Sequence, residues 1–165
     1  MHEKNCFITL TYNNENLPAD KSISKYEMQC FFKRMRKHYG KNSFKYFCCG
    51  EYGDKSGRAH YHAIVFGQDF SEDRLLHTKT KTGHLLFRSP TLEKLWTKGY
   101  SNIGDVTFQS CAYVARYIMK KRKGDLDTID PKTGKTNAQY YEAVDEETGE
   151  MYNLEPEFVL MSRGT

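Results

Sequence analysis

The chain has 165 residues, of which 38% are hydrophobic and 28% charged, with only 4 prolines and 12 glycines. This composition excludes disordered, collagen-like and fibrous proteins and fits one globular domain spanning 1–165. No stretch approaches the roughly 18 apolar residues of a membrane span, and the first residues lack the pattern of a signal peptide, so neither secretion nor membrane spanning is expected. The 5 cysteines include no C-x-x-C pair, which favours a reducing cytoplasm over a disulfide framework or zinc ribbon.

The formal net charge of +4 conceals an asymmetry along the chain. Residues 1–124 carry 22 Lys and Arg against 11 Asp and Glu, a balance of +11, while residues 125–165 carry 3 against 10, a balance of −7. The basic part attracts polyanions, and the 12 Tyr and 10 Phe offer stacking surfaces for unpaired bases. Composition therefore indicates nucleic acid as a partner, although charge runs are also typical of solvated helix faces.

The chain begins with a strand and a helix. Residues 6–12 (CFITLTY) are rich in β-branched and aromatic types and end at Asn-Asn, which predicts a strand. Ser24 and Glu27 have the spacing of a capping box, and apolar residues follow at helical spacing. These signals predict a helix over about 24–38.

A hairpin and a second helix–strand pair follow. Residues 43–52 and 59–66 are strand-like and flank the turn residues DKSG, which predicts a β-hairpin. The polar stretch after this hairpin shows no clear pattern. A short helix is predicted over 89–96, where Pro occupies the first helical position, and a strand over 100–107.

The last predicted elements include one helix and the acidic segment. Ser110 is predicted to cap a helix that runs to Lys123 and ends at a glycine. Within the acidic segment, residues 140–144 and 150–154 flank Glu-Thr-Gly and predict a second hairpin, and residues 158–161 predict a final strand.

Three candidate metal ligands fall on one side of the first hairpin. The period of two along a strand sends His60 and His62 to the same face. If the hairpin closes symmetrically about its turn, Glu51 lies opposite His60, with Cβ atoms about 5 Å apart, and His62 is its diagonal neighbour. Two imidazoles and a carboxylate with open coordination positions suit a divalent ion that also holds a phosphate oxygen. The alternative is that the histidines are structural or surface residues.

A second candidate group lies on the last predicted helix. Tyr113 and Tyr117 are four residues apart, so their side chains share a face and lie about 6 Å from each other, and Lys120 and Lys121 follow one turn later. Such a pair is usually core packing. Beside a metal set and a basic field it instead indicates a nucleophile, because a phenol attacking a phosphate needs a nearby ammonium or metal.

Basic side chains that could contact a phosphate backbone occur on the first helix, in the hairpin and on the last helix. A solvated surface is the alternative interpretation of the same residues. The candidates are Lys33, Arg34, Arg36, Lys37, Arg58, Arg116, Arg122 and Lys123.

Three of these sequence patterns together match a known family. FITLTY at 7–12, HYH at 60–62 and YVARYIMKK at 113–121 stand in the order and approximate spacing of the three motifs of HUH endonucleases. The chain is similar to rolling-circle replication initiators, most of all to those of gokushoviruses, which are single-stranded DNA phages of the microvirus group. The resemblance implies an α+β fold in which helices flank a mostly antiparallel sheet of about five strands.

The resemblance also implies an activity. It predicts a metal-dependent, site-specific endonuclease and strand transferase that initiates, and can terminate, rolling-circle replication through a covalent 5′-phosphotyrosine. His60 and His62 match the two histidine ligands and Glu51 matches the acidic third ligand, with Mg²⁺ or Mn²⁺ as the expected ion. Tyr113 and Tyr117 match the two-tyrosine form of the third motif.

Lys120 matches the lysine of that motif, with Lys121 adjacent. The implied partners are single-stranded DNA at a replication origin and the replication machinery of the host, in the host bacterial cytoplasm, with no membrane and no small-molecule substrate. An HUH transposase or relaxase would share the same residues and differ in its DNA. A non-catalytic module that binds single-stranded nucleic acid is the alternative from another class.

Overall fold

A computed structural model describes residues 2–53, 57–120, 125–145 and 147–162. Seven strands form one sheet in the order β4-β5-β6-β1-β3-β2-β9, in which every pairing is antiparallel. The fold is therefore α+β, as expected, with more strands than the expected five. The strands of this sheet are β1 (Asn5–Tyr12), β2 (Lys45–Tyr52), β3 (Ala59–Phe66), β4 (Leu75–Lys79), β5 (Leu85–Arg88), β6 (Gly99–Gly104) and β9 (Phe158–Met161).

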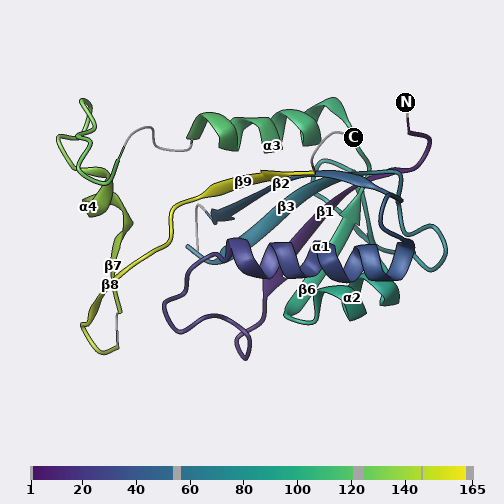
Figure 1. Ribbon diagram of the computed structural model, residues 1–165, viewed down its shortest axis with the longest axis horizontal. Helices are drawn as coiled ribbons and strands as arrows, with labels where there is room; N and C mark the ends of the chain where they lie inside the picture. Colours follow the sequence, from purple (N-terminus) through teal and green to yellow (C-terminus); the bar gives the residue numbers. More distant parts are fainter. Residues whose placement is uncertain (1, 54–56, 121–124, 146, 163–165) are drawn as a thin grey trace.

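Helices cover the two faces of the sheet unequally. Figure 1 shows α3 on one face and both α1 and α2 on the other. A small unit of α4 and a two-stranded sheet, β7 with β8, lies to one side of the large sheet (Figure 1). The bounds of these elements are α1 (Lys25–Tyr39), α2 (Pro90–Trp96), α3 (Phe108–Lys120), α4 (Asn137–Tyr141), β7 (Glu142–Val144) and β8 (Met151–Asn153).

None of the helices in the described part of the chain has the length and apolar character needed to cross a membrane.

The central strands place hydrophobic and chemically active side chains on opposite faces. In β1, Cys6, Ile8 and Leu10 are fully buried and belong to the large hydrophobic cluster that α1 and α2 complete. Phe7 and Thr9 alternate with them and therefore point to the face covered by α3. Since β1 lies between β3 and β6, the same division of faces extends across the middle of the sheet.

A buried tyrosine anchors the strand that carries both histidines. Tyr61 lies between them in sequence, so its side chain points to the α1 and α2 face, where it is fully buried. Its hydroxyl accepts a hydrogen bond from the Ser24 N–H at 2.6 Å and lies 2.8 Å from the hydroxyl of Tyr12. The rings of Tyr12 and Tyr61 also pack against Trp96, with centroids 5.4 and 5.7 Å away. This network ties β1, β3, α2 and the start of α1 together.

Only one of the two hydrogen bonds of the predicted capping box is present at the start of α1. The Ser24 side chain accepts the Glu27 N–H at 3.2 Å, which is the first bond of a capping box. The Ser24 N–H instead donates to Tyr61, while the Glu27 carboxylate lies 3.7 Å from the ammonium of Lys98. Tertiary contacts have therefore replaced the second bond of the box.

The prediction that Ser110 caps α3 is wrong. The helix begins at Phe108, and Thr107 Oγ1 accepts the Ser110 N–H at 3.1 Å while Ser110 Oγ accepts the Thr107 N–H at 2.8 Å. These reciprocal bonds are those of an N-cap with its third helical residue, which places the cap at Thr107. The preceding strand ends earlier than predicted, at Gly104. The predicted end of the helix at Lys123 lies outside the described residues.

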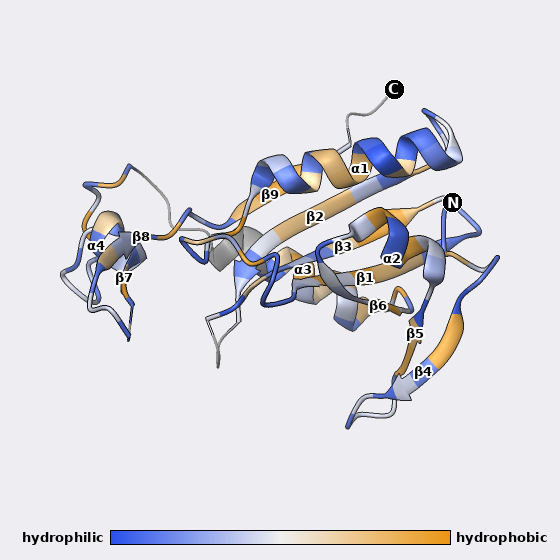
Figure 2. Ribbon diagram, turned by 90° about the horizontal axis from the view of Figure 1, so that it is seen from below, coloured by the Kyte–Doolittle hydropathy of each residue, from blue (hydrophilic) through white to orange (hydrophobic). Residues whose placement is uncertain are grey.

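Two further elements differ from the prediction. The polar stretch after β3 contains the β4–β5 hairpin, which Figure 2 shows extending from the edge of the sheet. Tyr140 and Tyr141 belong to α4 rather than to a strand, because Thr136 and Gln139 form a complete capping box that begins a helix there. The predicted pairing of the second hairpin is confirmed in a shorter form, between β7 and β8.

Removing the Tyr61 hydroxyl tests the anchor on β3. Tyr61→Phe leaves the Ser24 N–H and the Tyr12 hydroxyl without this buried partner, so the free energy of unfolding should fall by about 1–3 kcal/mol. Tyr100→Phe is the control, because Tyr100 is 64% exposed and its substitution should change stability by less than about 0.5 kcal/mol. Chemical denaturation followed by circular dichroism measures both values. Equal stability of the two variants would contradict a role for the network.

Candidate metal centre

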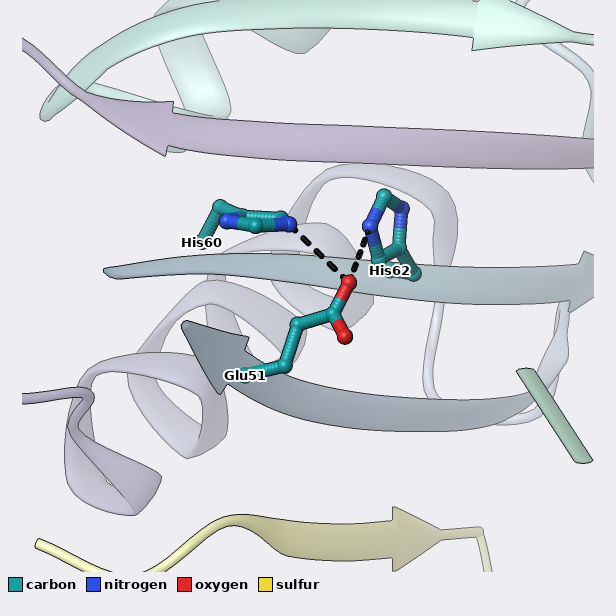
Figure 3. Close-up of side chains that lie close together, drawn as sticks. All are labelled: Glu51, His60 and His62. Atoms are coloured by element: carbon teal, nitrogen blue, oxygen red, sulfur yellow. Dashed lines mark hydrogen bonds and ion pairs between the residues drawn. The ribbon is translucent and has the colours of Figure 1, made fainter. Parts of the chain in front are cut away.

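Glu51, His60 and His62 meet on the α3 face of the β2–β3 hairpin. The predicted register is confirmed, because Glu51 pairs directly with His60. One carboxylate oxygen, Glu51 Oε1, lies 2.9 Å from His60 Nε2 and 2.8 Å from His62 Nε2 (Figure 3). The three ligand atoms lie within 4.8 Å of one another, close enough for all of them to bind one metal ion.

The site is largely shielded from water. The side chains of Glu51, His60 and His62 are 3%, 16% and 8% exposed. Burial by itself would raise the pKa of the Glu51 carboxyl, but hydrogen bonds and positive charge from the two histidines outweigh it, so this pKa lies below its usual value. Burial lowers the pKa of His62, because it disfavours the imidazolium, and the neighbouring Glu51 opposes that shift. A carboxylate beside a neutral His62 is the state that a cation requires.

The second ring nitrogens of both histidines have partners that fix the ring orientations. His60 Nδ1 lies 2.9 Å from the backbone oxygen of Arg58, and His62 Nδ1 lies 3.0 Å from Thr9 Oγ1. Phe7 stacks on His62, with centroids 5.4 Å apart and planes inclined by 16°. Both Nε2 atoms are thereby directed at Glu51, an arrangement typical of metal-binding histidines.

The hydrogen bonds around His60 fit a cation better than they fit neutral groups alone. The Arg58 carbonyl can only accept, so His60 Nδ1 carries a proton. His60 Nε2 then faces the Glu51 carboxylate, which also only accepts, and without a cation this contact requires a second proton on the ring. A divalent cation removes that requirement because Nε2 and the carboxylate oxygen both bind it. The donor set therefore fits a metal ion.

Tyr113 places a hydroxyl at the same carboxylate oxygen. Its Oη donates to Glu51 Oε1 at 3.1 Å, and its ring stands perpendicular to that of His62, with centroids 5.0 Å apart. The neighbouring Val114 is fully buried and packs with Cys49 and Ile64, which holds α3 against the sheet. Tyr113 is 36% exposed, so part of the residue is accessible to solvent.

The structure describes only part of the predicted catalytic and basic set on α3. Arg116 is described and exposed. The side chains of Tyr117 and Lys120 lie outside the described part of the structure. Three further candidates lie outside it entirely: Lys121, Arg122 and Lys123.

The predicted DNA-contacting residues of α1 are not brought to the site. They lie on the opposite face of the sheet: Lys33, Arg34, Arg36 and Lys37. Arg34 donates to the backbone oxygen of Leu95 at 2.7 Å and so closes the end of α2. The guanidinium of Arg36 lies over the rings of Phe44 and Tyr46, 5.6 and 5.4 Å from their centroids. Two of the four thus have structural partners on their own face.

Arg58 has a structural role at the site that sequence reasoning missed. Its Nε donates to the Tyr12 backbone oxygen at 2.9 Å and its Nη2 to Asn14 Oδ1 at 2.8 Å, while its own carbonyl holds His60. Thr9, which contacts His62, was also not predicted. The alternation of β1 places Thr9 on the correct face, but only the pairing of β1 with β3 puts it opposite His62.

Comparison with known proteins assigns the chain to a family. The family model for the replication-associated protein ORF2 matches residues 5–122, which include the whole metal centre and α3. No solved structure matches the chain.

Curated relatives agree with this match. The chain is 41% identical over 128 residues to replication-associated protein ORF4 of Chlamydia phage 1, 35% over 128 residues to replication-associated protein VP4 of Bdellovibrio phage phiMH2K, and 33% over 124 residues to replication-associated protein ORF2 of Spiroplasma virus 4. These alignments cover 73%, 73% and 71% of this chain, and 31%, 40% and 38% of the relatives. The chain thus spans between about a third and two fifths of the length of these proteins. It belongs to the family of the replication-associated protein ORF2.

Proposed function

We propose that residues 1–165 form one nuclease domain that cuts single-stranded DNA at a phage replication origin and joins the 5′ end to a tyrosine. The observation that carries the proposal is the contact of the Tyr113 hydroxyl with the carboxylate oxygen that also contacts both imidazoles. A nucleophile and three metal ligands therefore share one place. The family and the names of the relatives support a role in phage replication, which takes place inside the infected bacterium with the host's replication machinery.

The chemistry follows from the residues at this place. A divalent ion held by Glu51, His60 and His62 would polarise the scissile phosphate. The Tyr113 oxygen attacks phosphorus, the bond from phosphorus to the 3′ oxygen breaks, the phenol loses its proton and the 3′ oxygen gains one. The products are a 5′-phosphotyrosine and a free 3′-OH that a polymerase can extend.

The covalent product also explains why two tyrosines are useful. The phosphodiester is retained in the link to the enzyme, so a later attack by a 3′-OH rejoins the strand without ATP. Tyr117, one turn further along α3, is proposed as the nucleophile of the second cut. Lys120 and Lys121 are proposed to neutralise charge on the phosphate.

The metal centre is tested by binding rather than by activity. Mn²⁺ is the probe, because Mg²⁺ demands near-ideal octahedral geometry and gives up its bound water reluctantly. His60→Ala and His62→Ala should each weaken Mn²⁺ binding by more than about 100-fold in calorimetry, because loss of an outer-shell partner alone costs about 10- to 100-fold. His77→Ala removes an exposed histidine from β4 and should bind as the wild type does. Unchanged Mn²⁺ affinity in either of the first two variants would refute the centre.

The nucleophile is tested by mapping the covalent adduct. With Mn²⁺ and a randomised pool of single-stranded oligonucleotides, the wild type should form an adduct on Tyr113 or Tyr117. Tyr113→Phe should shift the adduct to Tyr117, and the double Phe variant should form none, as read by peptide mass spectrometry. Tyr100→Phe serves as the matched control because it removes a hydroxyl from an exposed tyrosine on β6. An adduct that persists in the double variant would exclude α3 as its source, and DNA binding without any adduct would favour a non-catalytic binding module.

The salt dependence of binding tests which face holds the DNA. For a short single strand at the site, Arg116→Ala should reduce the slope of log affinity against log salt by about 0.7, the value for one phosphate contact. The double variant Lys33→Ala/Lys37→Ala should leave that slope unchanged, because both residues lie on the opposite face. A reduction in the double variant only would mean that α1, whose basic residues are among the candidates predicted from the sequence, holds the strand instead of α3.

A further inference from the structure

A cavity of about 480 Å³ opens directly beside the metal centre. Phe7 and Gly104 line it from the sheet, and Leu86 lines it from the β4–β5 hairpin. His62, a ligand of the metal centre, lines this cavity, and so does Tyr113, whose hydroxyl donates to the ligand Glu51. The volume lies within the range of about 300–1,000 Å³ that is typical of small-molecule sites. A group held in the cavity therefore sits next to the atoms proposed to carry out cleavage.

The walls of the cavity suit a planar, apolar group with polar edges. The aromatic ring of Phe7 and the side chain of Leu86 offer apolar contact surfaces. Gln109, Asp105 and His84, which also line the cavity, carry hydrogen-bond donors and acceptors. This combination, an aromatic surface with polar side chains around it, is the one by which proteins hold unpaired nucleobases.

Exposed groups beside the cavity fit the rest of a nucleic-acid strand. Phe108, the residue just before Gln109, is 85% exposed and offers a surface on which a neighbouring base can stack. Lys79 and Lys81 are exposed and flank the lining residue Thr80. These two lysines supply positive charge on the hairpin for the phosphate backbone of a bound strand.

We propose that this cavity holds one base of the single-stranded DNA, adjacent to the phosphate that is cut, and that Gln109, Asp105 and His84 contribute polar contacts to the edge of this base. The inference rests on the proposed function, because the metal centre defines which phosphate lies beside the cavity. It adds that the site binds a base as well as a phosphate, with a binding surface built from the β4–β5 hairpin and the first turn of α3.

Gly104 offers a substitution that fills the cavity without touching the metal ligands. A Cβ at this position would lie 3.7 Å from Leu86 Cδ2 and 4.0 Å from the Phe7 oxygen, which are ordinary contacts. Gly104→Leu should therefore extend its side chain into the cavity and exclude the base. Gly104→Ala adds only a methyl group and fills less of the cavity than Gly104→Leu does. Thr78→Leu is the control, because it introduces a leucine at an exposed position of β4 outside the cavity.

The test compares oligothymidylate with a fully abasic oligonucleotide of the same length, without metal, so that binding is measured apart from cleavage. The wild type and Thr78→Leu should prefer the strand with bases by about 5- to 100-fold, the range for one stacked base. Gly104→Leu should lose most of this preference and keep its affinity for the abasic strand, with Gly104→Ala in between. A preference equal to that of the wild type in Gly104→Leu would overturn the proposal.

Backbone NMR of the unaltered protein provides a second measurement that does not depend on how the variants fold. Oligothymidylate should shift the amide signals of Leu86, Gly104 and Gln109, and the abasic strand should not. Equal shifts with both strands, or none, would overturn the proposal. A protein that forms the tyrosine adduct but fails both base tests would retain the proposed function and lose this inference, whereas a preference for the strand with bases in the absence of an adduct would do the reverse.

Discussion

The pairing of Glu51 with His60 across the β2–β3 hairpin is the constraint on which the rest of the site depends. A one-residue slip of this register would move Glu51 to the opposite face of the sheet from both histidines, because side chains alternate along a strand. The carboxylate would then be a buried charge without partners, which is strongly unfavourable. Tyr61, which lies between the histidines and is buried against α2 and the start of α1, keeps the register from slipping. Packing in the core on one face of the sheet therefore fixes the register that brings Glu51 and the two histidines together on the other face.

Elements with strong local signals were predictable, and those determined by tertiary contacts were not. The β2–β3 hairpin follows from its turn residues and strand-like flanks, so its register could be stated before the fold was known. Strand β4 gives no such signal, because it forms the free edge of the sheet and all five of its residues are exposed. The acidic segment shows the opposite effect. Tyr140 and Tyr141 are residue types that favour strands, but the capping box between Thr136 and Gln139 stabilises the start of a helix that includes both of them.

The same distinction holds for the candidate site. The three metal ligands follow from the period of a strand and the closure of one hairpin, both of which are local. Tyr113 was indicated by helical spacing and by family resemblance, and nothing local fixed its distance from Glu51. Thr9 and the Arg58 carbonyl escaped prediction, because each contacts a histidine ring only after β1 has paired with β3 or the hairpin has closed. Ligand identity is thus more predictable than ligand orientation.

The way α3 is held bears on how two tyrosines could serve one metal centre. Four helical residues span about 6 Å along the axis, so the backbones of Tyr113 and Tyr117 lie about one turn apart on α3. Tyr113 places its hydroxyl 3.1 Å from Glu51 Oε1. Val114 anchors the helix through the small cluster with Cys49 and Ile64, whereas the opposite face of the sheet carries the large core. The proposed alternate use of the two tyrosines would then require either the helix or the phosphate to shift by about one turn between the two cuts, and α3 is held to its face of the sheet by the smaller of the two clusters.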